Sequence, residues 1–317
     1  MELFSRPASV SYDDIKHQSP EEFRKEWEEW RRLREDYMKE PYGWLSLTSI
    51  DWLENGEPKT LDGFPGTWLQ QGDAVIYTPP EDDGIVITNH DAPVSEPVRI
   101  NVPEKGDFNL EDFYNGDVRA QLIKRIGVQH QFAIRIRDPH SAGIGQLQSI
   151  PSFEPDQRWV FPAKFEPAEQ HEDVTVGAVA GELSHDETSI GILHVDFDGE
   201  KRDLIVFEVH NDDSGARRID EATGEYIYLN NRANITNEGH VLFRDKTSGH
   251  ESYGGARVIG FDNSDPASVS YVDFNRSMNL PCAFTVFCTC PFAPLQNTLP
   301  LTIEAGEKKP AVFGSLE

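Results

Sequence analysis

The stretch QFAIRIR, residues 131–137, alternates apolar and polar side chains and decides the fold class of this 317-residue chain. Phe132, Ile134 and Ile136 fall on one side of an extended backbone and both arginines fall on the other, because successive side chains of a strand point to opposite faces. A strand with one apolar and one polar face is typical of an antiparallel sheet that covers a core on one side and meets water on the other. We therefore expect residues 131–137 to form a half-buried antiparallel strand.

Further short segments with the same two-residue period continue along the chain. Gly, Pro, Asp and Asn, which favour turns, separate these segments. No helical period lies between them, and this pattern favours an antiparallel sandwich or barrel. The other expected strands cover residues 74–78, 85–88, 174–180, 190–197, 204–210, 226–229, 240–243 and 268–274.

One amphipathic helix is predicted near the N-terminus, over about residues 20–40. Ser19 is a good N-cap, Pro20 suits the first helical position, and Glu22 completes a capping box. A stripe of apolar side chains then follows at helical spacing and predicts a face that docks onto the body of the protein. The stripe consists of Phe23, Trp27, Trp30, Leu33 and Tyr37, and Pro41 ends the helix. The predicted fold is thus all-β, or β-rich α+β, with one N-terminal helix packed on a single domain over residues 1–317.

The chain is strongly acidic, with 55 Asp plus Glu against 29 Lys plus Arg and a formal net charge of -26 at pH 7. This charge repels nucleic acid phosphates and anionic lipids, so we expect neither nucleic acid nor a membrane as a partner. The first residues form no apolar signal segment, and no apolar run approaches the ~18 residues that a membrane helix needs. We expect a soluble cytoplasmic protein whose partner is a small-molecule ligand or substrate, and self-association into a homo-oligomer stays open.

All three cysteines lie in NLPCAFTVFCTCPFAP, residues 279–294. If residues 283–290 formed one straight strand, Cys282 would lie roughly 26 Å from Cys290, at ~3.3 Å per residue. One zinc ion could not then bind both sulfurs. We therefore interpret the cysteines, including Cys288, as small buried apolar side chains in a protein of a reducing compartment, and not as a metal site or a disulfide framework.

Motifs for the commonest enzyme classes are absent from the sequence. A thiol nucleophile needs a base within hydrogen-bonding reach, and only the more distant His240 and His250 could supply one. The chain has no G-x-S-x-G nucleophile elbow, no P-loop, no dinucleotide-binding fingerprint and no H-E-x-x-H zinc motif. We therefore expect no cofactor.

The segment HVDFDGEKRDLIVFEVHND, residues 194–212, offers an alternative metal site. His194, Asp196 and Asp198 alternate on one face of a strand, an Asp-Gly pair favours a hairpin turn, and His210 with Asp212 lies on the returning strand. Imidazole and carboxylate groups of this kind suit a divalent ion. Solvated polar residues on an exposed hairpin explain the same pattern, so a metal-dependent enzyme stays a second alternative.

Several stretches form a recognisable pattern when they are taken together. They are YGWLSL at residues 42–47, FRD at 243–245, DFNRSMNLPCAFT at 273–285, CPFAPLQN at 290–297 and IEAGEK at 303–308. The chain resembles the family of domain of unknown function 1684 (DUF1684), and the last third carries the most specific part of the resemblance. That family has no assigned activity, so the resemblance implies a polar pattern and no mechanism. Leu280 stands where a second proline is more usual, and Cys288 has no counterpart in the pattern.

The positions that match this polar pattern define a candidate pocket in the last third of the chain. Neighbouring carboxylates can split their pKa values so that one donates a proton and the other accepts it, while Arg and Asn can hold an oxyanion. The leading hypothesis is a small-molecule enzyme, a hydrolase or acid–base catalyst, with catalytic residues Asp245, Tyr253, Asp273 and Glu307. Its substrate-binding residues would be Arg244, Arg257, Asn275, Arg276, Asn279, Asn297 and Glu304.

The alternative to an enzyme is a non-catalytic ligand-binding or scaffolding β-domain. In that case the same polar residues would satisfy one another in a buried hydrogen-bond network, with no cavity between them. An enzyme would instead gather them around a water-accessible pocket.

Overall fold

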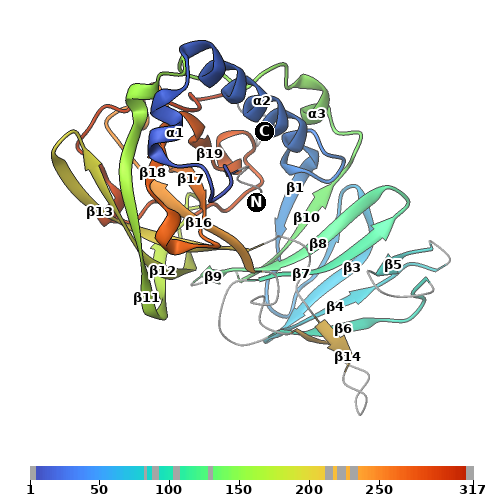
Figure 1. Ribbon diagram of the computed structural model, residues 1–317. Coiled ribbons are helices and arrows are strands. Elements are labelled where there is room, and N and C mark those ends of the chain that lie inside the picture. The colour runs from blue at the N-terminus through green and yellow to red at the C-terminus, as the bar shows by residue number, and fades with distance from the viewer. Residues whose placement is uncertain are drawn as a thin grey trace.

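A computed structural model of the protein describes residues 5–81, 84–87, 93–102, 108–127, 131–210, 217–219, 226–228 and 235–311. The strands form three sheets, of five, six and eight strands, and helices near the N-terminus lie across one end of the largest sheet (Figure 1). The expectation of a β-rich antiparallel fold with an N-terminal helix is confirmed.

Two of the sheets, built mostly from the first half of the chain, face each other as a sandwich. The five-stranded sheet has the order β1-β10-β8-β7-β5 and the six-stranded sheet the order β14-β15-β6-β4-β3-β2. Neighbouring strands are antiparallel except for β15 and β6, which are parallel. The strands are β1 (Leu47–Trp52), β2 (Pro58–Leu61), β3 (Phe64–Gln71), β4 (Ala74–Thr78), β5 (Val86–Ile87), β6 (Val98–Asn101), β7 (Phe108–Asn115), β8 (Val118–Lys124), β10 (Phe132–Arg137), β14 (Arg217–Ile219) and β15 (Tyr226–Tyr228).

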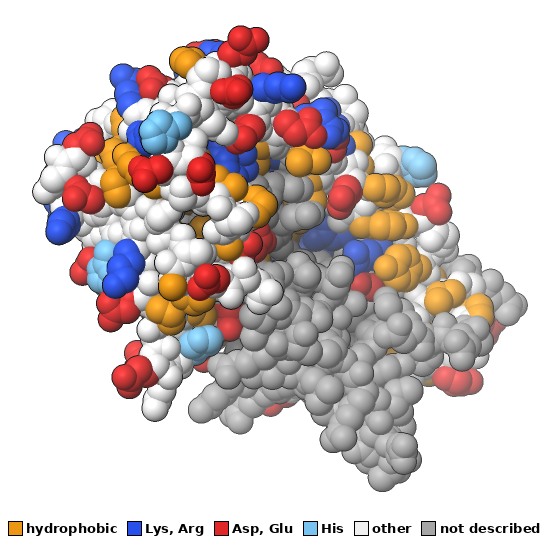
Figure 2. Space-filling view, in the orientation of Figure 1, with side chains coloured by type: hydrophobic (Ala, Val, Ile, Leu, Met, Phe, Trp, Pro, Cys, Tyr) orange, Lys and Arg blue, Asp and Glu red, His pale blue; other side chains and the backbone are white. Residues whose placement is uncertain are grey.

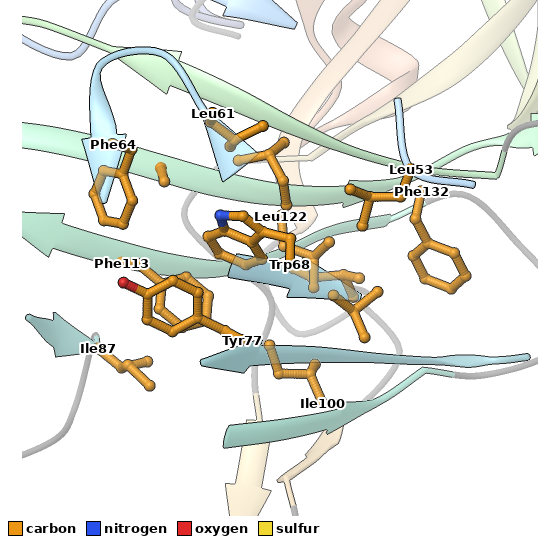
Figure 3. Close-up of a cluster of buried hydrophobic side chains, with 14 of the residues drawn as sticks. Leu53, Leu61, Phe64, Trp68, Tyr77, Ile87, Ile100, Phe113, Leu122 and Phe132 are labelled. Carbon is orange, nitrogen blue, oxygen red and sulfur yellow. The ribbon is translucent and has the colours of Figure 1, made fainter. Parts of the chain in front are cut away.

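An aromatic cluster fills the space between these two sheets (Figure 3). The ring of Trp68 on β3 lies 4.5 Å from that of Tyr77 on β4 and 4.8 Å from that of Phe113 on β7, measured between centroids. All three side chains are fully buried. Because burial of one large apolar side chain stabilises a fold by about 1.5–3 kcal/mol, this cluster is a major source of the sandwich's stability.

The third sheet curls around a core of its own (Figure 1). Its order is β18-β11-β12-β13-β16-β17-β19, and β9 also pairs with β12. The turn between β12 and β13 uses Asp198 and Gly199 at φ 54° and 100°, the left-handed values that a two-residue hairpin turn requires. The strands are β9 (Ile126–Gly127), β11 (Val160–Gly177), β12 (Leu183–Phe197), β13 (Glu200–His210), β16 (Ile235–Phe243), β17 (Arg257–Asp262), β18 (Tyr271–Asp273) and β19 (Met278–Asn279).

The helices are α1 (Tyr12–His17), α2 (Pro20–Met38) and α3 (Ala142–Gln146). The capping box of α2 is present as predicted, with Ser19 and Glu22 bonded to each other's backbone N–H groups. The buried stripe differs from the prediction at its end, because Leu33 is 38% exposed while Arg34 and Met38 are buried. A helix turns 100° per residue, so the face that contacts the sheet passes to positions 34 and 38 in the last turns. Among the described residues, no helix is long and apolar enough to cross a membrane.

The expected strands overlap observed ones, but two expectations need correction. All six residues of β10 are buried, so the strand is not half-exposed as the alternation suggested. Residues 283–290 form no strand at all; they follow a 3₁₀ turn at Pro281–Ala283. Both corrections concern the junction between the sandwich and the curled sheet, where the side chains of β10 and the cysteines meet.

Candidate functional site

Arg257 organises the first of three buried networks in the last third of the chain. Its Nη2 donates to Asp245 Oδ1 at 3.2 Å, and its Nη1 donates to the carbonyl of Ala305 at 2.5 Å. Asp245 also accepts the N–H of Ile303 at 2.8 Å. Burial lowers the pKa of Arg257, and the Asp245 carboxylate opposes that decrease. The pair thus ties the C-terminal segment to β17.

Glu307 belongs to a second network, which reaches helix α2. Its Oε1 accepts from Arg34 Nε at 3.0 Å, and its Oε2 accepts the N–H of Asn279 at 2.6 Å. Both charged side chains are 2% exposed. Asn279 also donates through Nδ2 to the carbonyl of Lys308 at 2.8 Å, so the network joins α2, β19 and the chain's last described segment.

Asp273 belongs to a third network, beside the N-terminal residues. Its Oδ2 accepts from Arg6 at 2.5 Å, and its Oδ1 accepts from the Asn275 amide at 2.8 Å. Arg276 lies 4.0 Å from the same carboxylate. Asp273 and Arg276 also line a cavity of about 30 Å³, which holds one or two water molecules rather than a substrate.

The remaining predicted residues are not part of these networks. Asn297 bridges β13 and β16, since its Oδ1 accepts from the N–H of Ile205 at 2.8 Å and its Nδ2 donates to the carbonyl of Leu242 at 2.9 Å. Arg244 is half-buried and Glu304 is exposed. The sequence hypothesis placed one pocket among these residues, whereas the structure gives each of the three buried carboxylates its own arginine.

The 194–212 hairpin does not bring its predicted metal ligands together. His194 lies opposite Asp203 on β13, while His210 pairs with Ile235 at the other end of that strand. Asp212 lies outside the described residues. Within the part of the chain that the structure describes, no group of three or more His, Cys, Asp or Glu side chains is placed to hold a metal ion.

The cysteine segment folds back on itself, which corrects the predicted 26 Å separation. Pro281 begins a 3₁₀ turn, closed by the N–H of Phe284 donating to the Pro281 carbonyl at 2.9 Å. As a result the N–H of Cys282 donates to Cys290 Sγ at 3.2 Å, and the N–H of Cys290 donates to Cys282 Sγ at 3.1 Å. The expectation of burial holds for Cys288 and Cys290, which are 6% and 8% exposed.

Tyr253, predicted to act beside the carboxylates, lies against the cysteines instead. Its hydroxyl interacts with the Cys282 thiol. Burial, followed by the neighbouring sulfurs, raises the pKa of Tyr253 above its ordinary value, so the hydroxyl keeps its proton. Tyr253 can therefore donate a hydrogen bond here but cannot act as a base.

Two arginines of β10 face the cysteine segment. Arg135 and Arg137, the arginine pair, are 2% and 5% exposed, and their guanidinium carbons lie 5.7 and 5.0 Å from the centre of the Trp44 ring. Arg135 Nη2 donates to Thr289 Oγ1 at 3.2 Å, and Arg137 Nη1 donates to the carbonyls of Tyr42 and Gly43, each at 2.9 Å. The arginine pair thus lies at the junction of the sandwich with the cysteine segment.

The hydrogen-bonding capacity of the arginine pair is incompletely used. Among the described residues, Arg135 Nε, Arg135 Nη1 and Arg137 Nε are buried and have no acceptor, although the charges of Cys288 and Asp112 act on Arg137. Burial, together with Arg135 and Arg119, lowers the pKa of Arg137 to about 10. The arginine pair therefore has buried donors that the described residues leave unused.

Sequence reasoning missed the arginine pair as functional residues. Alternating Arg and Ile is the ordinary pattern of a strand with one solvated face, and nothing local in QFAIRIR indicates that a second layer covers that face. The sequence has one weak signal of an anion site, which is the use of Arg rather than Lys at both positions. Arg is the commoner residue at buried anion sites.

By its fold the protein is a β-rich chain in which a two-sheet sandwich meets a curled antiparallel sheet. It belongs to the family described as "Protein of unknown function (DUF1684)", whose model matches residues 145–308, just over half of the chain. The stretch at residues 42–47 lies outside that match. The family therefore includes the curled sheet and the cysteine segment.

One solved structure is similar in part, an uncharacterized protein from Haloarcula marismortui determined by solution NMR. It is 24% identical, the match covers 52% of this chain and 78% of that chain, and the TM-score is 0.37. No curated protein matches the chain.

Proposed function

We propose that the protein binds a small anionic molecule, a carboxylate or a phosphate, at the arginine pair. The observation that carries this proposal is the set of buried guanidinium N–H groups of Arg135 and Arg137 that have no acceptor among the described residues. The protein would then be a ligand-binding β-protein.

The energetic argument is the cost of a buried charge. A buried ion without a partner destabilises a fold by several kcal/mol even after relaxation, and arginine is the residue best suited to pair with carboxylate and phosphate oxygens. Three donors of the arginine pair point to no protein acceptor. An anion at this position would satisfy them and remove the cost, so binding would stabilise the folded state.

Thr289 supports the same proposal. Its Oγ1 accepts from Arg135 at 3.2 Å and from Arg125 at 3.0 Å. Because both accepting positions of the hydroxyl are used, its proton is free to donate to an anion. Arg125 and Arg135 thus meet at the Thr289 hydroxyl, which adds a donor beside the arginine pair.

The hydrolase hypothesis has less geometric support. It needs Asp245, Asp273 or Glu307 to face a substrate, yet each carboxylate accepts hydrogen bonds from an arginine and from a backbone N–H. Both oxygens of each carboxylate accept a hydrogen bond, an arrangement that holds segments together.

The test is a thermal-shift and calorimetric titration with inorganic phosphate and, separately, with acetate and succinate. We expect a saturable increase in Tm with at least one of them, because a ligand at 100 times its Kd stabilises the folded state by about 2.7 kcal/mol. Arg135→Gln should abolish the increase, because it removes two of the three buried donors that have no acceptor among the described residues.

The matched control is Arg158→Gln, because Arg158 also lies over a tryptophan, Trp159, at 5.1 Å, but is exposed and pairs with Asp156. This control should bind as the wild type does. A titration without saturation for every anion, or an unchanged response in Arg135→Gln, would contradict the proposal.

A further inference from the structure

The fold-back of the cysteine segment creates a cluster of three thiols. Cys282 and Cys290 exchange N–H···S hydrogen bonds across the loop, at 3.2 and 3.1 Å. The thiol of Cys288 forms hydrogen bonds with both of the others. Three sulfurs that interact directly can exchange protons and form bonds with one another, which three isolated buried thiols cannot do.

Of the three thiols, Cys288 is the one whose pKa is lowered. Burial alone would raise the pKa of the Cys288 thiol. Burial is the largest single influence, but the hydrogen bonds from the other two thiols and the charges of Arg135 and Arg137 together outweigh it and lower that pKa well below its ordinary value. The pKa values of Cys282 and Cys290 are raised, so these two residues stay protonated and act as donors.

We propose that Cys288 is a thiol modification site that hydroperoxides oxidise, and that Cys282 then closes a disulfide bond with it. The proposal goes beyond anion binding and rests on a different observation, the meeting of the three sulfurs. Cys288 has no counterpart in the family's polar pattern, so the proposal concerns this chain.

The chemistry proceeds in two balanced steps. The Cys288 thiolate attacks one oxygen of hydrogen peroxide, the O–O bond breaks, and the leaving hydroxide takes a solvent proton to become water, which leaves a sulfenic acid. The Cys282 sulfur then attacks the Cys288 sulfur, the S–O bond breaks, and the second hydroxide takes the Cys282 proton and leaves as water. The peroxide is reduced to two water molecules and the two thiols are oxidised to one disulfide.

Cys282 is a better resolving residue than Cys290. Cys288 and Cys290 are separated by a single residue along the chain, so a disulfide between them would close a very small ring. Cys282 approaches from across the fold-back, and it is the most exposed of the three thiols. Cys282 can therefore move toward Cys288 with less distortion of the backbone.

The test is peptide mapping by mass spectrometry of the full-length protein after hydrogen peroxide treatment. We expect a disulfide between Cys282 and Cys288 in the wild type and in Cys290→Ala. In Cys282→Ala we expect a sulfenic acid on Cys288 that dimedone traps. A Cys282–Cys290 disulfide of equal yield in Cys288→Ala, or a Cys288 that stays reduced in the wild type, would overturn the proposal.

A second measurement uses only the wild type, in case a substitution prevents folding. At pH 7 we expect iodoacetamide to modify Cys288 at least about tenfold faster than Cys282 and Cys290, because the thiolate is the reactive form. Equal rates for the three residues would contradict the assignment. If the protein binds anions but peroxide does not oxidise it, the disulfide proposal is wrong and the proposed function is supported. If peroxide forms the disulfide but no anion binds, the proposed function is wrong and the disulfide proposal is supported.

Discussion

At the scale of single residues, some buried arginines are neutralised by a carboxylate and others are not. Arg34 and Arg257 pair with Glu307 and Asp245, and these four side chains are 0–2% exposed. The arginine pair of β10 has no such partner. Neutralised arginines hold segments together, whereas buried arginines without a counter-charge favour a bound anion.

Replacing Glu307 should therefore cause a large loss of stability. Glu307→Ala leaves Arg34 charged and buried without a partner, and we expect the free energy of unfolding to fall by about 3–5 kcal/mol. Urea denaturation measures this change. The double replacement Arg34→Met with Glu307→Leu should recover most of the loss, while Glu29→Gln, which alters an exposed ion pair on α2, should cause no measurable change.

A small effect of Glu307→Ala would mean that Arg34 reaches water in the folded protein. It would also weaken the interpretation of the other buried arginine networks as structural links between segments.

At the scale of secondary-structure elements, neighbouring strands of the curled sheet place complementary groups side by side. His194 on β12 forms hydrogen bonds with Asp203 on β13 through Nδ1, at 2.7 Å, and with Glu166 on β11 through Nε2, at 3.3 Å. The antiparallel register sets this arrangement, because His194 lies directly opposite both Asp203 and Lys164. Cross-strand pairs of opposite charge stabilise a sheet modestly.

This arrangement predicts the titration of His194. The hydrogen bond to Asp203, followed by that to Glu166, raises the pKa of His194 above 6.5. The charged imidazole therefore contributes stability that is fully present below the unfolded-state pKa and is lost as the pH rises through the folded-state pKa. NMR titration of the imidazole resonances should show the increase.

Asp203→Asn should lower the His194 pKa toward its ordinary value. Asp196→Asn is the matched control, because Asp196 lies two residues along the same strand and accepts the Gly199 N–H instead, at 2.6 Å. If both variants shifted the pKa equally, the general acidity of the surface, and not the cross-strand pair, would be responsible.

At the scale of the whole molecule, the acidic charge acts on every element at once, and Figure 2 shows acidic side chains spread over the described part of one face. A net charge of -26 at pH 7 produces self-repulsion that opposes the compact state. The N-terminal helix and the junction of the sandwich with the curled sheet hold the parts together, since Trp27 and Trp30 of α2, Leu47 of β1 and Cys288 share one apolar cluster.

Salt should therefore stabilise the protein. Raising NaCl from 0.1 to 1 M shortens the Debye length from about 10 to about 3 Å and screens the repulsion. We expect Tm at pH 7 to rise, by about 2–4 °C for each kcal/mol gained. The same titration near pH 4.7, where the net charge of the chain is close to zero, is the control and should give a much smaller rise. Equal rises in Tm at both pH values would show that salt does not act by screening the net charge.

The sequence by itself determined the features that depend on neighbours along the chain. The strand at residues 74–78, the capping box of Ser19 and Glu22, and the Asp198-Gly199 turn are all present where the local pattern predicts them. Period, cap and turn chemistry act over a few residues, so a short stretch contains all the information that they require.

Only the tertiary structure decided the candidate sites. Arg6 and Arg34 come from the far end of the chain to meet Asp273 and Glu307, the polar face of β10 is covered by the cysteine segment, and a single turn at Pro281 converts a supposed strand into a cluster of thiols. An alternating strand has the same local pattern whether water or another layer covers its second face. Which of the two occurs depends on how distant segments pack, and no local pattern encodes that.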